Sequence, residues 1–182
     1  MRRIVSFGAG AREKLAEGGK KLADAVGRTL GPFGENVFID KKNAVTNDGV
    51  TVAREFHLED EVENRGVVAI REAAIKAVDE VGDGTSTAIV LAYAIYDRVS
   101  HYLGDTTTQR KMPPTQVVRK IDEERKMIDQ KLQEMATPVD SKEKLVESAI
   151  VSVEDPELGK LIGETQWELG PQGYMIAEEV PE

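Results

Sequence analysis

Apolar residues recur at helical spacing along most of this 182-residue chain. Leu15, Leu22 and Val26 share one face of a helix near the N-terminus, and Gly31 and Pro32 mark a stop just beyond it. The same periodicity predicts further helices over residues 61–81, 85–103, 114–135, 141–152 and 156–169. The pattern therefore predicts a mainly α-helical protein.

Two short runs of β-prone residues interrupt the helical pattern. Residues 36–40 and 44–46 are separated by Lys41, Lys42 and Asn43, which predicts a β-hairpin. A two-stranded hairpin is marginal by itself, so it is expected to pack on another part of the protein. Tyr174 begins one more predicted strand.

The predicted helix over residues 85–103 is apolar on almost every side in its first half. Such a helix is expected at the centre of a core, yet the other predicted helices offer only narrow apolar stripes to cover it. Because large exposed apolar patches drive association, the chain alone is expected to be an oligomer, to pair with a complementary chain, or to be poorly stable.

Residues 82–87, with the sequence GDGTST, are the most informative segment for function. Their glycines let successive amides point at one spot, and the start of the following helix attracts an anion. Asp83 would repel that anion unless it holds a divalent cation that bridges to phosphate oxygens. An N-capped helix after a glycine turn accounts for the same residues, and this segment alone leaves both interpretations open.

Two more glycine turns favour the phosphate interpretation. They are residues 29–34, TLGPFG, and residues 46–51, TNDGVT, although Asp-Gly is also a common β-turn pair. No GxxxxGK[S/T] loop occurs in the sequence. Three such turns suit a nucleotide whose phosphates and metal are held mostly by backbone amides and carboxylates.

Composition and charge limit the alternatives. The net charge is −9, with 33 acidic and 24 basic residues, which disfavours nucleic acid as a partner. The absence of cysteine excludes disulfides and thiolate metal sites. The longest apolar run, residues 88–95, is too short to span a bilayer, and the N-terminus lacks the features of a signal peptide. These features predict a cytoplasmic protein with no nucleic-acid or membrane partner.

Several further motifs occur in a characteristic order and spacing. They are VSFG at 5–8, LADAV at 22–26, TLGP at 29–32, NV at 36–37, TNDGVTVARE at 46–55, LED at 58–60 and GDGTSTA at 82–88. Together they resemble the N-terminal part of a chaperonin subunit, and the resemblance weakens but persists through residues 121–122, Pro138 and residues 159–162. It is closer to the bacterial and organellar group than to the archaeal and eukaryotic one, although TNDG at 46–49 is closer to the latter.

The resemblance implies that the chain covers only the outward path of a larger subunit. Residues 1–135 would be the N-terminal half of the equatorial ATP-binding domain, a helical bundle, and residues 136–182 the first half of the intermediate hinge domain. The apical domain and the return path would be absent, together with the catalytic aspartate. Hydrolysis by this chain is then expected to be slow, with no certain catalytic residue and Asp48 as the candidate for an assisting role.

The same resemblance implies a binding site for ATP and Mg²⁺. Asp83 would hold the magnesium ion, the next four residues would bind phosphate, and Asp48 would flank the γ-phosphate side. Asn47 stands where the bacterial group has a lysine, so a charge contact to phosphate is expected to be missing. The expected cofactor-binding residues are Thr29, Leu30, Gly31, Pro32, Asp48, Gly49, Asp83, Gly84, Thr85, Ser86, Thr87 and, from the intermediate domain, Ile150.

The implied function is the ATP-binding portion of a chaperonin that assists protein folding through ATP-driven conformational changes of a ring. The alternative is a stand-alone truncated relative that acts as a non-catalytic nucleotide-binding or assembly module. The implied partners are ring neighbours, contacted through Ile4–Phe7 and the Val37–Val45 hairpin. Non-native proteins would be the substrates of the intact subunit, and a co-chaperonin is a further candidate partner.

Overall fold

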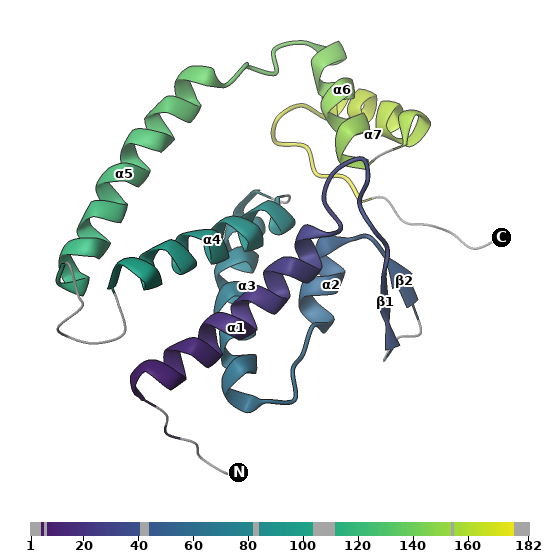
Figure 1. Ribbon diagram of the computed structural model, residues 1–182. Coiled ribbons are helices and arrows are strands. Elements are labelled where there is room, and N and C mark those ends of the chain that lie inside the picture. Colours follow the sequence, from purple (N-terminus) through teal and green to yellow (C-terminus); the bar gives the residue numbers. More distant parts are fainter. Residues whose placement is uncertain are drawn as a thin grey trace. The chain divides into compact units, whose positions relative to one another are not determined.

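The computed structural model describes residues 5, 7–40, 44–81, 84–103, 112–153 and 155–176. These residues form helices and one antiparallel hairpin (Figure 1), which confirms the predicted fold class. The helices are α1 (Gly8–Gly27), α2 (Gly49–Glu55), α3 (Glu61–Val81), α4 (Thr85–Leu103), α5 (Pro114–Met135), α6 (Lys142–Val153) and α7 (Pro156–Leu169), and the strands are β1 (Val37–Ile39) and β2 (Ala44–Thr46).

The chain divides into two compact units, Met1–Glu123 and Glu124–Glu182. The division falls inside α5, whereas the sequence analysis places the boundary between its half-domains after residue 135. The assignment of these parts to an equatorial and an intermediate domain remains a prediction. Within the described residues, none of the helices combines the length and apolarity needed to cross a bilayer.

The core of the first unit lies where α1, α2, α3 and α4 meet. Burial of these aliphatic side chains supplies the main driving force for the packing, at roughly 1.5–3 kcal/mol for each large side chain. The core residues are Leu22, Ala23, Val26, Val52, Ala53, Val67, Ala74 and Ile89.

Glycines allow α1 and α3 to touch backbone to backbone. A Cβ atom at Gly18 would lie 1.8 Å from the backbone oxygen of Glu63, and one at Gly66 would lie 2.0 Å from the backbone oxygen of Leu15. The neighbouring atoms belong to the main chain of the other helix, so they cannot rotate away. Any side chain at either glycine would therefore push the two helices apart.

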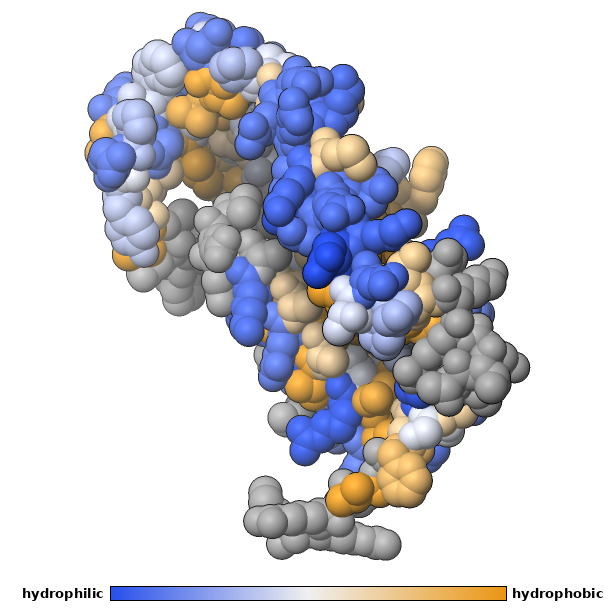
Figure 2. All heavy atoms as spheres, turned by 90° about the vertical axis from the view of Figure 1, so that its left-hand side faces the viewer, coloured by the Kyte–Doolittle hydropathy of each residue, from blue (hydrophilic) through white to orange (hydrophobic). Residues whose placement is uncertain are grey.

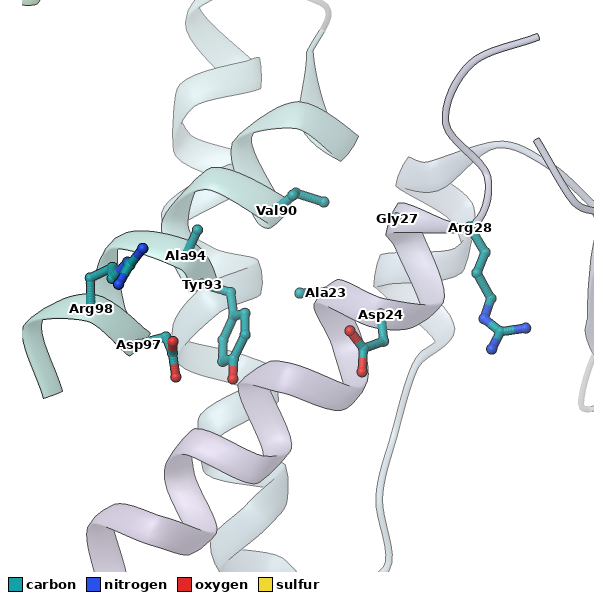
Figure 3. A pocket seen from close by; sticks show the side chains of 9 residues that line it. All are labelled: Ala23, Asp24, Gly27, Arg28, Val90, Tyr93, Ala94, Asp97 and Arg98. Carbon is teal, nitrogen blue, oxygen red and sulfur yellow. The ribbon is translucent and has the colours of Figure 1, made fainter. Parts of the chain in front are cut away.

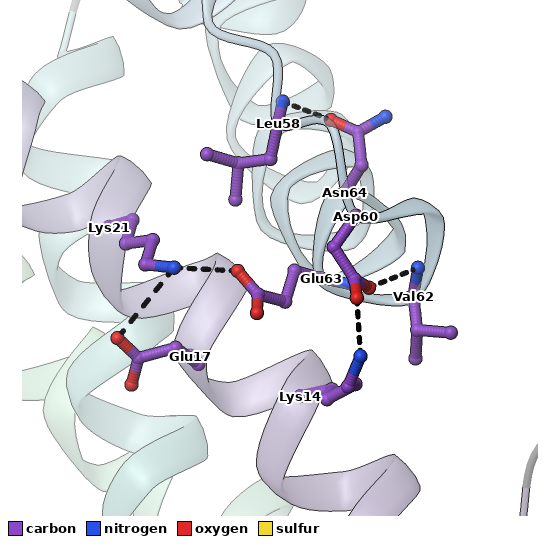
Figure 4. Close-up of polar contacts among 8 residues, drawn as sticks. All are labelled: Lys14, Glu17, Lys21, Leu58, Asp60, Val62, Glu63 and Asn64. Atoms are coloured by element: carbon purple, nitrogen blue, oxygen red, sulfur yellow. Dashed lines mark hydrogen bonds and ion pairs between the residues drawn. The ribbon is translucent and has the colours of Figure 1, made fainter.

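Ion pairs line the edge of this contact (Figure 4). Lys14 pairs with Asp60, and Lys21 lies 2.6 Å from the carboxylate of Glu63. Asp60 also accepts hydrogen bonds from the amides of Val62 and Glu63 at the start of α3. The Lys14 ammonium holds the pKa of Asp60 below its usual value. Exposed ion pairs contribute little to stability because solvent screens them, so these contacts orient the helices more than they stabilise them.

Helix α2 was not predicted from the sequence, which indicated only a turn at residues 46–51. The helix has seven residues, too few to produce a clear apolar period. Asp48 caps its start, and Arg71 of α3 lies 3.4 Å from three carbonyl oxygens at its end, those of Ala53, Arg54 and Phe56. A cation at a helix C-terminus is favourable, so α3 helps to hold α2 in place.

The predicted hairpin is present. Strands β1 and β2 pair in antiparallel register, with Phe38 directly opposite Val45. Ile39 is buried, whereas Phe38 and Val45 are 58% and 64% exposed. One face of the hairpin therefore packs on the protein and the other presents two apolar side chains.

The expectation that α4 is central to a core is only half met. Ile89 is fully buried against the other helices, but Leu91 and Ile95 are 56% and 53% exposed. The described elements of the first unit pack on one side of α4, and its other apolar side has no cover among them.

Apolar side chains also reach the surface among hydrophilic ones elsewhere (Figure 2). On α5 they are Val118, Ile121, Met127, Ile128, Leu132 and Met135.

In the second unit, α6 and α7 pack closely through two glycines of α7. A Cβ atom at Gly159 would lie 2.5 Å from the Cα of Ile150, and one at Gly163 would lie 2.6 Å from the Cα of Val146. The expected cap at Ser141 is present, because its hydroxyl accepts a hydrogen bond from the amide of Lys144. Residues 174–176 form no strand, contrary to expectation, since no partner strand lies beside them in the described part of the chain.

Replacing Gly18 by alanine should destabilise the first unit by about 1–3 kcal/mol, because the new methyl group overlaps the backbone of α3. Gly10→Ala is the matched control, since a Cβ atom there meets nothing within 4 Å on the same helix. That variant should gain about 0.5–1 kcal/mol from helix propensity. Urea unfolding followed by circular dichroism measures both, and equal stabilisation by the two substitutions would contradict the close helix contact.

Candidate functional site

The N-terminus of α4 combines an open glycine with a buried hydroxyl. Gly84 has a φ of +88°, and a Cβ atom at this position would meet nothing within 4 Å. Thr85 is only 3% exposed, and its Oγ1 has no hydrogen-bond partner in the described part of the protein. A buried hydroxyl without a partner costs about 1–3 kcal/mol. The first amides of a helix lack intrahelical partners as well, so this end of α4 suits an anionic ligand.

The three hydroxyl residues that begin α4 lie in different surroundings. Thr85 is buried, Ser86 is half-buried and Thr87 is exposed. The Ser86 hydroxyl is directed at Gly49 of α2, where a Cβ atom would lie 1.8 Å from the Ser86 Oγ. The same phosphate-binding role is expected of all three hydroxyls from the sequence, whereas the structure places them in different surroundings.

Asp48 is held at the start of α2 by three hydrogen bonds. Its carboxylate accepts from the amides of Val50 and Thr51, at 3.2 and 3.0 Å, and from the Thr51 hydroxyl. The backbone amide of Asp48 donates to the Thr46 hydroxyl at 3.0 Å. Partial loss of water by itself raises the pKa of Asp48, but the hydrogen bonds outweigh this effect and lower the pKa below its ordinary value. Asp48 is therefore an ionised, oriented carboxylate.

The turn after α1 is closed by its own backbone. The Thr29 hydroxyl donates to the carbonyl of Val26 at 2.8 Å, and the Gly34 amide donates to the carbonyl of Gly31 at 2.9 Å. Gly31 has a φ of +80° and nothing within 4 Å of a Cβ position, while Leu30 and Pro32 are exposed. The turn thus presents an open backbone apex at Gly31.

The structure brings the ends of three helices together at Gly49. A Cβ atom at Gly49 would meet the Ser86 side chain of α4 and, at 3.3 Å, the Cγ1 of Val26 on α1. The Thr29 turn begins three residues after Val26. The end of α1 and the starts of α2 and α4 therefore meet, and they carry most of the residues proposed from the sequence.

Two of the expected site residues are not placed there by the structure. Asp83, the expected magnesium ligand, lies outside the described residues. Ile150 belongs to the second unit, where it packs against Gly159, and it is described within that unit only. No cluster of three or more His, Cys, Asp or Glu side chains in the described part of the chain could hold a metal ion. The role of Asp83 therefore stays a prediction.

A pocket of about 590 Å³ lies between α1 and α4 and includes none of the predicted site residues (Figure 3). Tyr93 projects from α4 between the carboxylates of Asp24 and Asp97, and burial together with these two charges raises its pKa. No local sequence pattern indicates this pocket, because it depends on which helices lie side by side. It is lined by Ala23, Asp24, Gly27, Arg28, Val90, Tyr93, Ala94, Asp97 and Arg98.

Asp48→Ala should destabilise the first unit by about 1 kcal/mol, because the N-cap of α2 is lost, whereas Asp48→Asn should cost less since asparagine also caps helices. The ionised carboxylate stabilises the folded state fully above the unfolded-state pKa, and this contribution is lost as the pH falls through the lowered folded-state pKa. The stability difference between wild type and Asp48→Asn should therefore shrink on acidification. Urea unfolding of the three proteins at neutral and acidic pH checks both points, and an Asp48→Ala protein as stable as wild type would refute the cap.

Comparison with known proteins gives a match to the TCP-1/cpn60 chaperonin family over residues 22–166. Two crystal structures of the chaperonin gp146 from the bacteriophage EL 2 (Pseudomonas aeruginosa), both in the presence of ATP-BeFx, are similar to this chain. They show 33% and 32% sequence identity, with TM-scores of 0.70 and 0.69. The matches cover 87% and 85% of this chain but 28% and 27% of the phage chain.

Proposed function

The chain belongs to the TCP-1/cpn60 chaperonin family, and we propose that it is the ATP-binding portion of a chaperonin that assists protein folding. It spans 28% of the length of the phage chaperonin that it matches. The activity of a whole chaperonin, including ATP-driven motion of a ring, is therefore part of the proposal. A cytoplasmic location and the binding of non-native proteins and a co-chaperonin belong to it as well.

The observation that carries the proposal is the buried Thr85 hydroxyl at the start of α4. Its Oγ1 has no partner in the described part of the chain, although leaving a buried hydroxyl unpaired is costly. It lies beside helix amides that favour an anion and next to Gly84, whose Cβ position is open. A phosphate oxygen would satisfy the hydroxyl and the amides together. The phage relative was crystallised in the presence of ATP-BeFx, which makes a nucleoside triphosphate the preferred candidate.

We infer that the residue types of these turns would suit a magnesium nucleotide. Gly84, Thr85 and the first amides of α4 would hold phosphate, residues 29–32 would line the nucleotide, and Asp48 would flank the terminal phosphate. Asp83 would hold Mg²⁺, which in phosphoryl transfer neutralises charge between phosphate oxygens. Asn47 supplies no cation, so the charge of the phosphates would be balanced mainly by the metal and the helix dipole. Binding is therefore expected to depend strongly on magnesium.

The exposed apolar side chains support the proposal of association with ring neighbours. Phe38 and Val45 face outward from the hairpin, and Val5 and Phe7 near the N-terminus are 86% and 87% exposed. Among the described residues, β1 and β2 have no further strand beside them, so the edges of this sheet can accept a strand from another chain. The same surfaces suit the second candidate, a non-catalytic assembly module. The first function requires Mg-ATP to be bound and turned over, whereas a non-catalytic nucleotide-binding or assembly module requires no turnover.

Thr85→Val should weaken Mg-ATP binding by about tenfold while stabilising the nucleotide-free protein by about 1 kcal/mol. The opposite signs arise because valine keeps the shape of threonine and removes a buried hydroxyl that the protein leaves unpaired. Isothermal titration with Mg-ATP and thermal unfolding without nucleotide measure the two effects. Unchanged affinity would argue against phosphate at this site, and a less stable protein would mean that the hydroxyl serves the fold.

Asp83→Ala provides the metal arm of the same experiment. We expect it to remove most of the magnesium dependence of ATP binding and to leave the fold intact, because the proposed role of Asp83 is to hold the metal. Titrations with and without Mg²⁺ separate the two contributions. Equal affinities of wild type and Asp83→Ala for Mg-ATP would eliminate the metal role, and loss of the folded signal would identify Asp83 as a helix cap.

A further inference from the structure

We propose that Ser86 is a positioning residue that sets the place of Asp48 relative to Thr85 by filling the space that Gly49 leaves open. The proposal rests on the proposed function, because it concerns the same nucleotide site. It departs from the expectation that the Ser86 hydroxyl binds phosphate. The close contact between Gly49 and Ser86 is the observation that carries it.

The contact leaves no room for a side chain on α2. A Cβ atom at Gly49 would lie 1.8 Å from the Ser86 Oγ and 3.1 Å from the Ser86 Cβ. The Cγ1 of Val26 closes a further side at 3.3 Å, and Val26 is fully buried in the core. The start of α2 is therefore enclosed between α1 and α4.

At position 49 a side chain is opposed by space rather than by backbone conformation, because it would require the Ser86 hydroxyl to rotate and the Ser86 Cβ and Val26 to move. The described glycines with positive φ are Gly8, Gly31, Gly84 and Gly170, and Gly49 is not among them. Alanine could adopt the backbone conformation of Gly49 without strain. A substitution at this position therefore tests the steric contact without backbone strain, and the double-mutant cycle separates the contact from the change in helix propensity.

The contact links the two groups that are proposed to face the ligand. Asp48 directly precedes Gly49, and its carboxylate is tied to the first turn of α2 by the amides of Val50 and Thr51. Thr85 directly precedes Ser86 on α4. Any displacement of Gly49 away from Ser86 would thus change the separation of the Asp48 carboxylate from the Thr85 hydroxyl. Because the Ser86 hydroxyl points at α2, we assign it to this spacing.

A double-mutant cycle on positions 49 and 86 tests the proposal. Gly49→Ala should lower the melting temperature of the nucleotide-free protein by about 3 °C and weaken Mg-ATP binding about tenfold. In a Ser86→Gly background both the Oγ and the Cβ at position 86 are gone, so adding Gly49→Ala should change affinity less than about threefold. Gly10→Ala, which adds a methyl group in open space, should leave the affinity for Mg-ATP unchanged.

Each outcome separates this proposal from the proposed function. A loss of melting temperature in Gly49→Ala without a loss of affinity would overturn the positioning role and leave only a packing contact. Additive effects of the two substitutions would overturn the contact itself. If wild type failed to bind Mg-ATP, the proposed function would fail and the positioning role with it, whereas coupling in the nucleotide-free melting temperatures would still establish the contact.

Discussion

The arrangement of the first unit depends on the backbone contact between α1 and α3. Gly18 and Gly66 let the two helices approach until main-chain atoms of each touch the other, and this closeness fixes their crossing. Helix α4 packs across both of them, and Arg71 of α3 holds the end of α2. The last turn of α1 then lies beside the starts of α2 and α4. The Gly18 contact lies about 14 Å of helix before the end of α1 at Gly27, and it is part of what brings the proposed ligand-binding turns together.

Close packing and a buried hydroxyl without a partner are found side by side at this junction in the described part of the chain. Val26 and Ile89 are fully buried, while Thr85 keeps a buried hydroxyl without a partner in the described part of the chain. A fold optimised for stability alone would place an apolar side chain of the same shape at position 85. Polar groups of this kind persist where they serve a ligand, because the binding free energy offsets their cost. The rigid apolar surroundings then hold the hydroxyl and the nearby Asp48 in place.

Local sequence patterns were sufficient to predict the elements in which an apolar periodicity is sustained over several turns or a strong turn signal is present. The helix over residues 85–103 and the hairpin after residue 36 could be predicted because each shows its own periodicity or turn chemistry. Helix α2 could not, since seven residues give hardly two turns, although Asp48 followed by the apolar residues Val52 and Ala53 was a usable capping signal. The contact of Ser86 with Gly49 and the pocket at Tyr93 depend on tertiary neighbours, which no local pattern encodes. Asp83 carries the strongest motif and lies outside the described residues.

A partner chain that covered the exposed apolar side chains would stabilise this chain. Leu91 and Ile95 of α4 lie on the helix whose first turn carries Thr85, so a partner that covered them would also restrain the proposed phosphate site. A partner that bound the hairpin would likewise restrain Asp48. Strand β2 ends at Thr46, and the Thr46 hydroxyl accepts a hydrogen bond from the Asp48 amide. Binding partners and a nucleotide would therefore act on the same short elements. A partner chain that orders one of these elements lowers the conformational entropy that the nucleotide would have to remove on binding, and the reverse also holds. Binding of a partner chain and binding of a nucleotide would therefore favour each other.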